Sequence, residues 1–459
     1  MRVAGVVGLA IEGTRVMRTF LLVLGNSLVA NTTTNMVWFG LMFWAYLSTR
    51  SVLVTSLLGG MYMLLVSALS IPFGILVDRL PKKLAMSLAT SVSTVAFAVA
   101  WMMCQFVSPD ALIDMYGWAF WALATVVLLG AVAGSVRDVA LATCVSILVP
   151  SEDRPKANGW VGIVQGVGFS VNTVTSGLII GYLGLRWLLG LGAVLIALSL
   201  VHLVTIRLVD PVFSELGEEL PRARLVQGLH LARTVPGLMG LIAFSTLNNL
   251  LAGVYLGLLD PYGLQLVSVQ QWGAMYTVLS VGFVIGGALI QKTGLGINPV
   301  RTLLSVNLVM WALGTVMTIR ESILLLAMGV VLFMVLATYA EAAEQTVMQK
   351  VVPFREQGRV FGFALAVERL AVPVSTFIVG PLAEFWVMPY MDSDAGRQAF
   401  GWLLGEGTTR GIALVFMIAS ASGLLLIGLA FLSQPYAVLS RTYADASVND
   451  RIVAPGAGT

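Results

Sequence analysis

The chain has 459 residues, of which 58% are apolar and only 11% are charged. Soluble globular proteins carry about 25% charged residues, so this chain cannot cover its surface with polar groups, and its solvent must largely be lipid. The net charge of +3 is modest, and the basic residues form no patch that would suit a nucleic acid.

Residues 1–18 begin with a short apolar run that is followed by Glu12, Arg15 and Arg18. The run is too short to cross a bilayer, because a span needs about 20 apolar residues for a hydrocarbon core about 30 Å thick. We see no small-residue cleavage site after it, which disfavours a cleaved signal peptide. The sequence therefore predicts a cytoplasmic N-terminal segment at the membrane interface, with a cleaved signal as the lesser alternative.

Twelve apolar segments follow, and each is long enough to span a membrane. None of them alternates with period two, which excludes a β-barrel. We therefore predict an all-α polytopic membrane protein with twelve transmembrane helices, at about residues 19–47, 51–77, 83–107, 117–149, 157–184, 187–208, 237–262, 269–291, 298–319, 322–350, 360–388 and 408–434.

A polar stretch at residues 209–235 divides the chain into an N-terminal half at 19–208 and a C-terminal half at 236–434. This cytoplasmic linker is either a plain tether or includes an amphipathic surface helix. Superposing the halves aligns Asn35 with Asn248, Gly60 with Gly273, and Asp138 with Glu341. The weak repeat predicts two pseudo-symmetric six-helix halves. Residues 435–459 are expected to form a cytoplasmic tail.

Most of the 26 lysines and arginines fall on one side of this layout. The positive-inside rule then places both termini in the cytoplasm. Only five arginines are expected on the outer side, namely Arg50, Arg186, Arg320, Arg397 and Arg410. Short loops without an appended domain favour a bacterial plasma (inner) membrane, and we expect a monomer.

The connection between the second and third segments reads GILVDRLPKK, residues 74–83. It resembles the helix 2–3 loop signature of the major facilitator superfamily, G-x-x-x-D-R-x-G-R-K, with Pro81 and Lys82 as departures. GALIQKTG at residues 287–294 resembles the degenerate copy expected between helices 8 and 9. The resemblance implies the major facilitator fold and a conformational latch formed by Gly74, Asp78, Arg79, Lys82 and Lys83. The alternative makes the basic residues mere orientation anchors.

Two further stretches resemble the twelve-helix drug:proton antiporter (multidrug efflux) branch of that superfamily. They are VPSEDRPKAN at residues 149–158 and VPFREQGRVFG at residues 352–362. One departure concerns the fifth helix, where Val171 and Asn172 stand in place of the branch's Gly-Pro pair.

Several charged residues fall inside predicted helices, where a charge is costly and usually marks a functional or paired site. Burial disfavours the charged form of a carboxyl group, which can then carry a proton and release it when a cationic substrate binds. The alternative is a permanent ion pair with one of the arginines. Glu344 is ranked lower because it lies closer to the inner interface. The candidates for proton coupling are Asp138, Glu341, Glu368, Arg137 and Arg369.

Amide and aromatic residues in the first and seventh predicted helices suit a cavity for amphipathic molecules. Asn31, Asn35 and Trp38 share one helix face, as do Asn248 and Tyr255. Interhelical hydrogen bonding without a ligand is an equally good reading.

The cysteines and histidines have no spacing that would suit a metal, so we expect no metal and no cofactor. The sequence contains no nucleotide-binding loop and no motif of a membrane enzyme, so we expect no catalytic residues. We predict a secondary exporter of small amphipathic organic compounds (drugs) in the lipid bilayer, which exchanges them for protons. An exporter of an endogenous lipid or siderophore-like metabolite, and a nutrient importer or facilitator, remain as alternatives.

Overall fold

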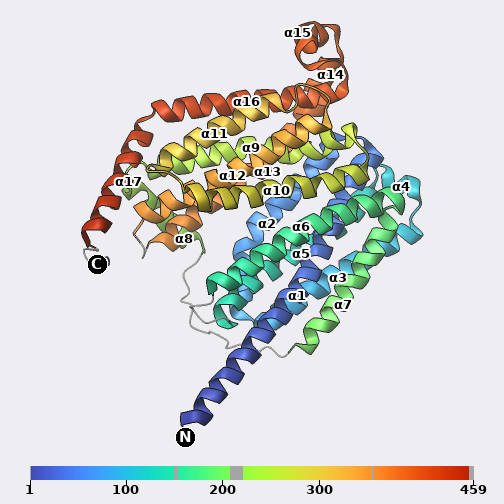
Figure 1. Cartoon of the computed structure of the whole chain (residues 1–459). Helices are drawn as coiled ribbons and strands as arrows, with labels where there is room; N and C mark the ends of the chain where they lie inside the picture. The colour runs from blue at the N-terminus through green and yellow to red at the C-terminus, as the bar shows by residue number, and fades with distance from the viewer. Residues whose placement is uncertain (1, 149–153, 207–220, 354–355, 454–459) are drawn as a thin grey trace. The chain divides into compact units, whose positions relative to one another are not determined.

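The computed structural model describes residues 2–148, 154–206, 221–353 and 356–453. Helices make up nearly all of these ranges, and the described residues include no strand (Figure 1). This confirms the predicted all-helical fold class.

Six long helices and one short one make up the chain up to Thr205, and the long ones coincide with the first six predicted spans. The helix α1 begins at Arg2, so the N-terminal segment is continuous with the first span. The elements are α1 (Arg2–Thr49), α2 (Val52–Arg79), α3 (Lys82–Phe106), α4 (Pro109–Ile113), α5 (Trp118–Leu148), α6 (Arg154–Tyr182) and α7 (Leu185–Thr205).

The rest of the chain repeats this order with additions. The described part of the linker forms the helix α8, and the described part of the expected tail forms α17. A π-helical turn and two short helices stand between α13 and α16. The elements are α8 (Pro221–Thr234), α9 (Leu238–Leu266), α10 (Val269–Thr293), α11 (Pro299–Val316), α12 (Ile323–Val351), α13 (Gln357–Leu382), η1 (Ala383–Val387), α14 (Met388–Asp392), α15 (Asp394–Leu404), α16 (Thr408–Leu432) and α17 (Gln434–Val453).

Within the described residues, 10 helices are long and apolar enough to cross a membrane. The helices α1 and α6 cover the two remaining predicted spans. The helix α1 has the amides Asn26, Asn31 and Asn35 along its length. Polar side chains in a membrane helix usually face protein or water rather than lipid.

The chain divides into two compact units. The first unit holds α1, α2 from Ala68 onward, α3 to α7, and residues 268–277 at the start of α10. The second unit holds Ser51–Ser67 at the start of α2, together with α8, α9, the rest of α10 and the helices that follow. The N-terminal part of α2 therefore belongs to the second unit and the rest of α2 to the first. For α10 the assignment is reversed: its N-terminal part belongs to the first unit and its remainder to the second.

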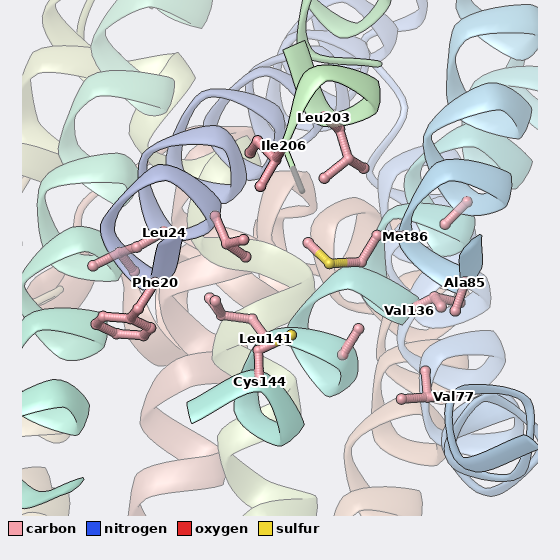
Figure 2. Close-up of a cluster of buried hydrophobic side chains, with 13 residues drawn as sticks. Phe20, Leu24, Val77, Ala85, Met86, Val136, Leu141, Cys144, Leu203 and Ile206 are labelled. Carbon is pink, nitrogen blue, oxygen red and sulfur yellow. The ribbon is translucent and has the colours of Figure 1, made fainter. Parts of the chain in front are cut away.

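An apolar cluster anchors α1, α2, α3, α5 and α7 of the first unit to one another. Figure 2 shows its side chains, among them Phe20 of α1, Val77 of α2, Met86 of α3 and Cys144 of α5. In a bilayer, lipid tails are as apolar as leucine, so close packing rather than the hydrophobic effect stabilises such contacts. The cluster includes Val136, next to the charged pair of α5.

Two helices of the first unit cross closely at a pair of glycines. A Cβ atom on Gly177 of α6 would lie 2.6 Å from the Val269 carbonyl oxygen of α10. A Cβ atom on Gly273 would in turn lie 3.0 Å from the Cα of Gly177. Only residues without side chains allow this approach, which is the role of small residues where membrane helices pack.

The second unit has a corresponding crossing between the start of α2 and α13. A Cβ atom on Gly380 of α13 would lie 2.9 Å from Ser56 Oγ of α2. The π-helical turn η1 follows directly after α13 and presents Glu384 to the first turn of α2. The Glu384 carboxylate accepts hydrogen bonds from Ser51 Oγ, at 2.7 Å, and from the Leu53 backbone N–H, at 2.6 Å. It therefore caps the α2 N-terminus, where the helix dipole favours negative charge.

Candidate functional site

Asp138 of α5 is an exposed carboxylate within a long apolar helix of the first unit. The side-chain amide of Asn31 on α1 donates a hydrogen bond to Asp138 Oδ1. Asn31 is half-buried, so this pair lies at the edge of the packed helices rather than inside them. A carboxylate fixed by one amide and still open on its other side can bind a proton or a cationic group.

Arg137, the preceding residue, points into the packed helices and is only 1% exposed. Its guanidinium donates to Thr90 Oγ1 of α3, and to Asn26 Oδ1 of α1 at 2.8 Å. Asn26 also donates to the Ser199 carbonyl oxygen, at 2.8 Å. No carboxylate lies within ion-pair distance of Arg137 in the described part of the chain, and Arg137 Nε has no hydrogen-bond partner there. Neutral hydrogen-bonding groups thus solvate a buried cation.

Three half-buried aromatic side chains meet further along the face of α1 that carries Asn31. The ring centroid of Phe39 (α1) lies 5.8 Å from that of Phe169 (α6) and 5.6 Å from that of Tyr276 (α10). Phe39 follows Asn31 by two steps of four residues, so Asn31, Asn35 and Phe39 share one face of α1. At about 1.5 Å per residue, the Cα atoms of Asn31 and Phe39 are about 12 Å apart along the helix. We call Phe39, Phe169 and Tyr276 the aromatic cluster.

The predicted cavity residues of α1 therefore differ in their surroundings. Asn31 and Asn35 are half-buried, whereas Trp38 is buried and 7% exposed. Phe39, one residue further on, contributes its ring to the aromatic cluster instead. The predictions for α9 concern residues engaged in helix packing. Asn248 Oδ1 accepts from Trp311 Nε1 at 2.8 Å, and the Tyr255 ring stacks on Phe416 with a centroid distance of 4.4 Å.

The second unit buries the carboxyl group of Glu368, which is 8% exposed, whereas Arg369, which follows it, is exposed. One carboxylate oxygen of Glu344 on α12 and one of Glu368 on α13 are buried and have no hydrogen-bond partner among the described residues. Glu341 is exposed and accepts a hydrogen bond from Gln345 Nε2 at 3.4 Å. Glu368 is a residue that the sequence favoured, and Glu344 is one that it ranked lower.

The residues of the helix 2–3 connection hold helix ends together. Lys82 Nζ donates to the Val77 carbonyl oxygen near the end of α2, at 2.6 Å. Lys83 Nζ donates to the Ile206 carbonyl oxygen directly after α7, at 2.7 Å. Both ammonium groups lie at helix C-termini, where the helix dipole favours positive charge. Arg79 is exposed and Gly74 has open space around it, while the Asp78 side chain lies outside the described residues.

Sequence reasoning missed one further buried charge, Arg410. It was expected in an outer loop, but the structure places it inside the second unit at 1% exposure. Its guanidinium donates to the Thr318 carbonyl oxygen and lies 3.7 Å from a carboxylate oxygen of Glu321. Its position at the first turn of α16 gave no signal of burial. Among the described residues, no group of three or more metal-binding side chains gathers in one place.

The family model of the Major Facilitator Superfamily matches residues 20–376. The chain belongs to this superfamily. No curated protein matches the sequence. Solved structures with the same fold include a bacterial homologue of the human lysosomal transporter Spinster, in an inward-facing and unoccupied conformation. It has a TM-score of 0.63 and 13% identity, and the match covers 94% of this chain and 98% of that one.

Two other solved transporters are similar over comparable lengths. The nucleoside transporter NupG has a TM-score of 0.61 and 13% identity, with 88% of this chain and 98% of that chain covered. A bacterial metal transporter has a TM-score of 0.56 and 15% identity, with 90% and 98% covered. At these identities the likeness concerns the fold alone. The superfamily and fold make this chain a multi-pass membrane transporter rather than an enzyme.

Proposed function

We propose that this chain exports amphipathic organic compounds in exchange for protons, by alternating access. The observation that carries the proposal is the arrangement on one face of α1. An exposed carboxylate, Asp138, is held by Asn31, and the aromatic cluster lies about two turns away on the same face. A flat apolar surface next to an anion is complementary to an amphipathic cation, which places its charge at one end and its rings at the other.

The coupling follows from competition for one carboxylate. A proton bound to Asp138 neutralises it and removes the attraction for a cationic compound. A compound that binds from the cytoplasm displaces this proton to the cytoplasmic side, and a proton that enters from outside later displaces the compound. One proton then moves inward for each compound that moves outward at this site. Such a cycle requires that the two ligands bind the same group with opposite effects.

The proposal includes a location and an assembly state. We place the protein in a bacterial plasma (inner) membrane, as a monomer, with both termini in the cytoplasm, because most lysines and arginines fall on that side. Lys82 and Lys83, at the connection between α2 and α3, are among these basic residues.

The helix 2–3 connection is proposed to act as a conformational latch through Asp78 and Arg79. Charges at this connection hold one conformation when they pair with a neighbouring helix and release it when they separate. Asp78→Asn and Arg79→Ala are expected to lower transport more than tenfold at unchanged amounts of folded protein. Unchanged transport in both variants would leave these residues as orientation anchors.

The decisive experiment uses the full chain in liposomes that contain a pH-sensitive dye. Ethidium, a fluorescent amphipathic cation, is added under an imposed proton gradient, together with a panel of neutral drugs. We expect a compound-dependent proton flux in the wild type, its loss in Asp138→Asn, and its retention in Glu341→Gln as the matched control. Asn31→Ala is expected to lower the flux several-fold, because it removes the amide that orients the carboxylate.

The alternatives produce different results in the same assay. Compound movement without proton flux in any variant would favour a facilitator. A response to a nucleoside or another polar nutrient, but not to ethidium, would favour an importer on the same fold. A response confined to lipids or siderophore-like compounds would favour export of an endogenous metabolite. Proton flux that survives in Asp138→Asn would move the coupling site to another residue.

A further inference from the structure

The second unit contains an apolar pocket of about 250 Å³, and none of its lining residues belongs to the proposed exchange site. We propose that this pocket binds an acyl chain of an anionic phospholipid whose phosphate group is held by Arg301 and Arg441. The lipid is a resident ligand and not the transported compound. The inference depends on the proposed function only for the assignment of this side of the membrane to the cytoplasm.

Four helices of the second unit form the walls of the pocket. The helix α16 packs against both α9 and α11, and α17, which begins directly after α16, packs on all three (Figure 1). Of the side chains that line the pocket, only those of Ser433 and Tyr436 carry a polar atom. The Ser433 hydroxyl donates to the Ala430 carbonyl oxygen at 2.7 Å, which leaves the wall apolar.

The pocket extends from the helix ends toward the middle of the helices. Gly237, at the start of α9, lines it together with Leu439 of α17, and so does Leu247, which lies about 15 Å further along the axis of α9. Leu247 and Leu429 are 46% and 59% exposed, so the pocket is open to its surroundings. On an apolar helix face of a membrane protein these surroundings are hydrocarbon, and a long apolar pocket of this kind fits a lipid chain.

Two arginines stand at the end of the pocket that is near the helix ends. Arg301 at the start of α11 and Arg441 on α17 each lie within two positions of a residue that lines the pocket. Asn298 joins the two segments, because its Oδ1 accepts from the Arg301 backbone N–H at 3.2 Å and its amide donates to Ser440 Oγ. Both arginines are exposed, and neither forms an ion pair in the described part of the chain.

This arrangement matches the two parts of an anionic phospholipid. A guanidinium keeps its charge and binds phosphate through two parallel hydrogen bonds. Two such cations favour an anionic headgroup over a zwitterionic one, whose own cation offsets its phosphate. Basic residues beside an apolar membrane surface are typical of sites that recognise anionic lipids. The pocket binds the chain, and Arg301 and Arg441 bind the headgroup.

Native mass spectrometry of the full chain in a neutral detergent tests the proposal, because it counts bound lipids by their mass. Phosphatidylglycerol and phosphatidylcholine with the same dioleoyl chains serve as the anionic and the zwitterionic probe. An arginine near an anionic headgroup contributes about a fivefold gain in affinity, so we expect one phosphatidylglycerol to bind about 25-fold more tightly than phosphatidylcholine.

Variants separate the headgroup from the chain. The double variant Arg301→Gln/Arg441→Gln should bind the two lipids with affinities within about twofold of each other. Arg359→Gln, an exposed arginine on α13, which contributes nothing to the pocket, is the matched control and should keep the preference. Ala243→Phe fills the pocket and should weaken both lipids about tenfold, whereas Ala421→Phe, at an exposed position outside the lining, should not.

If Ala243→Phe fails to fold, the wild type provides the same test with dihexanoyl phosphatidylglycerol. Its shorter chains bury less apolar surface, so it should bind more than about tenfold more weakly than the dioleoyl lipid. Equal affinities for the two chain lengths would remove the chain from the pocket.

Other results would overturn the proposal in different ways. Equal binding of both dioleoyl lipids to the wild type would mean a non-selective lipid contact, and a preference that survives in the double arginine variant would place the headgroup elsewhere. Binding of inorganic phosphate as tight as that of phosphatidylglycerol would assign the arginines to free phosphate. A lipid-free dimer that Ala243→Phe abolishes would assign the pocket to a second copy of the chain. The measurement uses no proton gradient and no transported compound, so its outcome is independent of ethidium exchange.

Discussion

Each of the two units contains a pair of adjacent residues with opposite charge well inside a membrane helix, Arg137–Asp138 and Glu368–Arg369, and these two pairs are oriented in opposite ways. In the first unit Arg137 is buried and Asp138 is exposed. In the second unit Glu368 is buried and Arg369 is exposed. Because adjacent residues on a helix point about 100° apart, only one member of each pair can face the packed interior.

The interior accommodates Arg137 and Glu368 by different routes. A guanidinium cannot lose its proton in a protein, so the first unit surrounds Arg137 with the oxygens of Asn26 and Thr90. A carboxyl group can take up a proton, and Glu368 Oε1 has no hydrogen-bond partner among the described residues. The charge of Arg137 is therefore fixed, as is that of Arg410 in the second unit, whereas the charge of Glu368 can change.

The largest effect is expected from removing the partner of the fixed charge. Asn26→Leu removes the amide oxygen that accepts from Arg137 and leaves the buried cation with Thr90 and a distant Ser199 hydroxyl. Hydrogen bonds to charged groups contribute about 1.5–3 kcal/mol, so we expect the protein to lose about 3 kcal/mol of stability. Thermal unfolding in detergent, followed by tryptophan fluorescence, measures the change.

The double variant Asn26→Leu/Arg137→Met sharpens this prediction. It removes the cation together with its partner, and should therefore recover part of the stability that Asn26→Leu loses. If the double variant is less stable than Asn26→Leu alone, the oxygen of Asn26 does not solvate the charge. Arg137 would then not be a buried charge that neutral side-chain oxygens stabilise.

The close helix crossing in the first unit should give the next largest effect. Gly177→Val places side-chain atoms where the Val269 carbonyl oxygen and Gly273 of α10 now lie. Overpacking of this kind destabilises by about 1–3 kcal/mol, and it should also lower transport of ethidium. Gly287→Val is the control, because a Cβ atom at Gly287 meets nothing within 4 Å. Equal unfolding temperatures for the two variants would contradict the close approach of α6 and α10.

The sequence predicted the helices well because hydropathy and length alone fix where a chain can cross a bilayer. It also selected Asp138 and Glu368, since any charge within an apolar segment is conspicuous. It could not tell which face of each helix is buried, because in lipid both faces are apolar. For that reason it did not indicate Phe39, whose ring joins the aromatic cluster, and it assigned Arg410 to a loop.

Contacts between residues that are far apart in the sequence are harder to predict than the positions of the helices. Depth along the helix ranked Glu344 below Glu341, yet Glu344 is half-buried with one buried carboxylate oxygen and Glu341 is exposed. The distance of an acid from the helix end does not specify its partner, because the partner comes from another helix whose rotation the sequence leaves undetermined. The π-helical turn that brings Glu384 to the start of α2 gave no sequence signal for the same reason.

That turn provides the third prediction, which concerns the crossing in the second unit. Glu384→Gln keeps an oxygen for Ser51 and Leu53 but removes the negative charge at the α2 N-terminus. Charges at helix ends contribute about 0.3–1 kcal/mol, or up to ~2 when partly buried, so we expect a loss of about 1 kcal/mol. Hydrogen exchange of the amides in residues 51–58 should accelerate about fivefold, which corresponds to that free energy. Residues 84–95 of α3 serve as the internal control, and uniform acceleration of both segments would indicate global destabilisation instead.

The smallest effect is expected at the changeable charge, where Glu368→Gln should alter stability by no more than about 0.5 kcal/mol. A buried carboxyl group that carries a proton is neutral, and a glutamine of the same shape is neutral too, so the replacement removes no buried charge. Glu368→Ala is the contrasting variant, because it removes most of a buried side chain and leaves a cavity; we expect it to lose about 2 kcal/mol. Thermal unfolding of both variants, measured beside Asn26→Leu, tests whether the charge of Glu368 can change by uptake of a proton. A loss in Glu368→Gln as large as that in Asn26→Leu would mean that Glu368 holds a fixed negative charge, and the two units would then neutralise their buried charges in the same way.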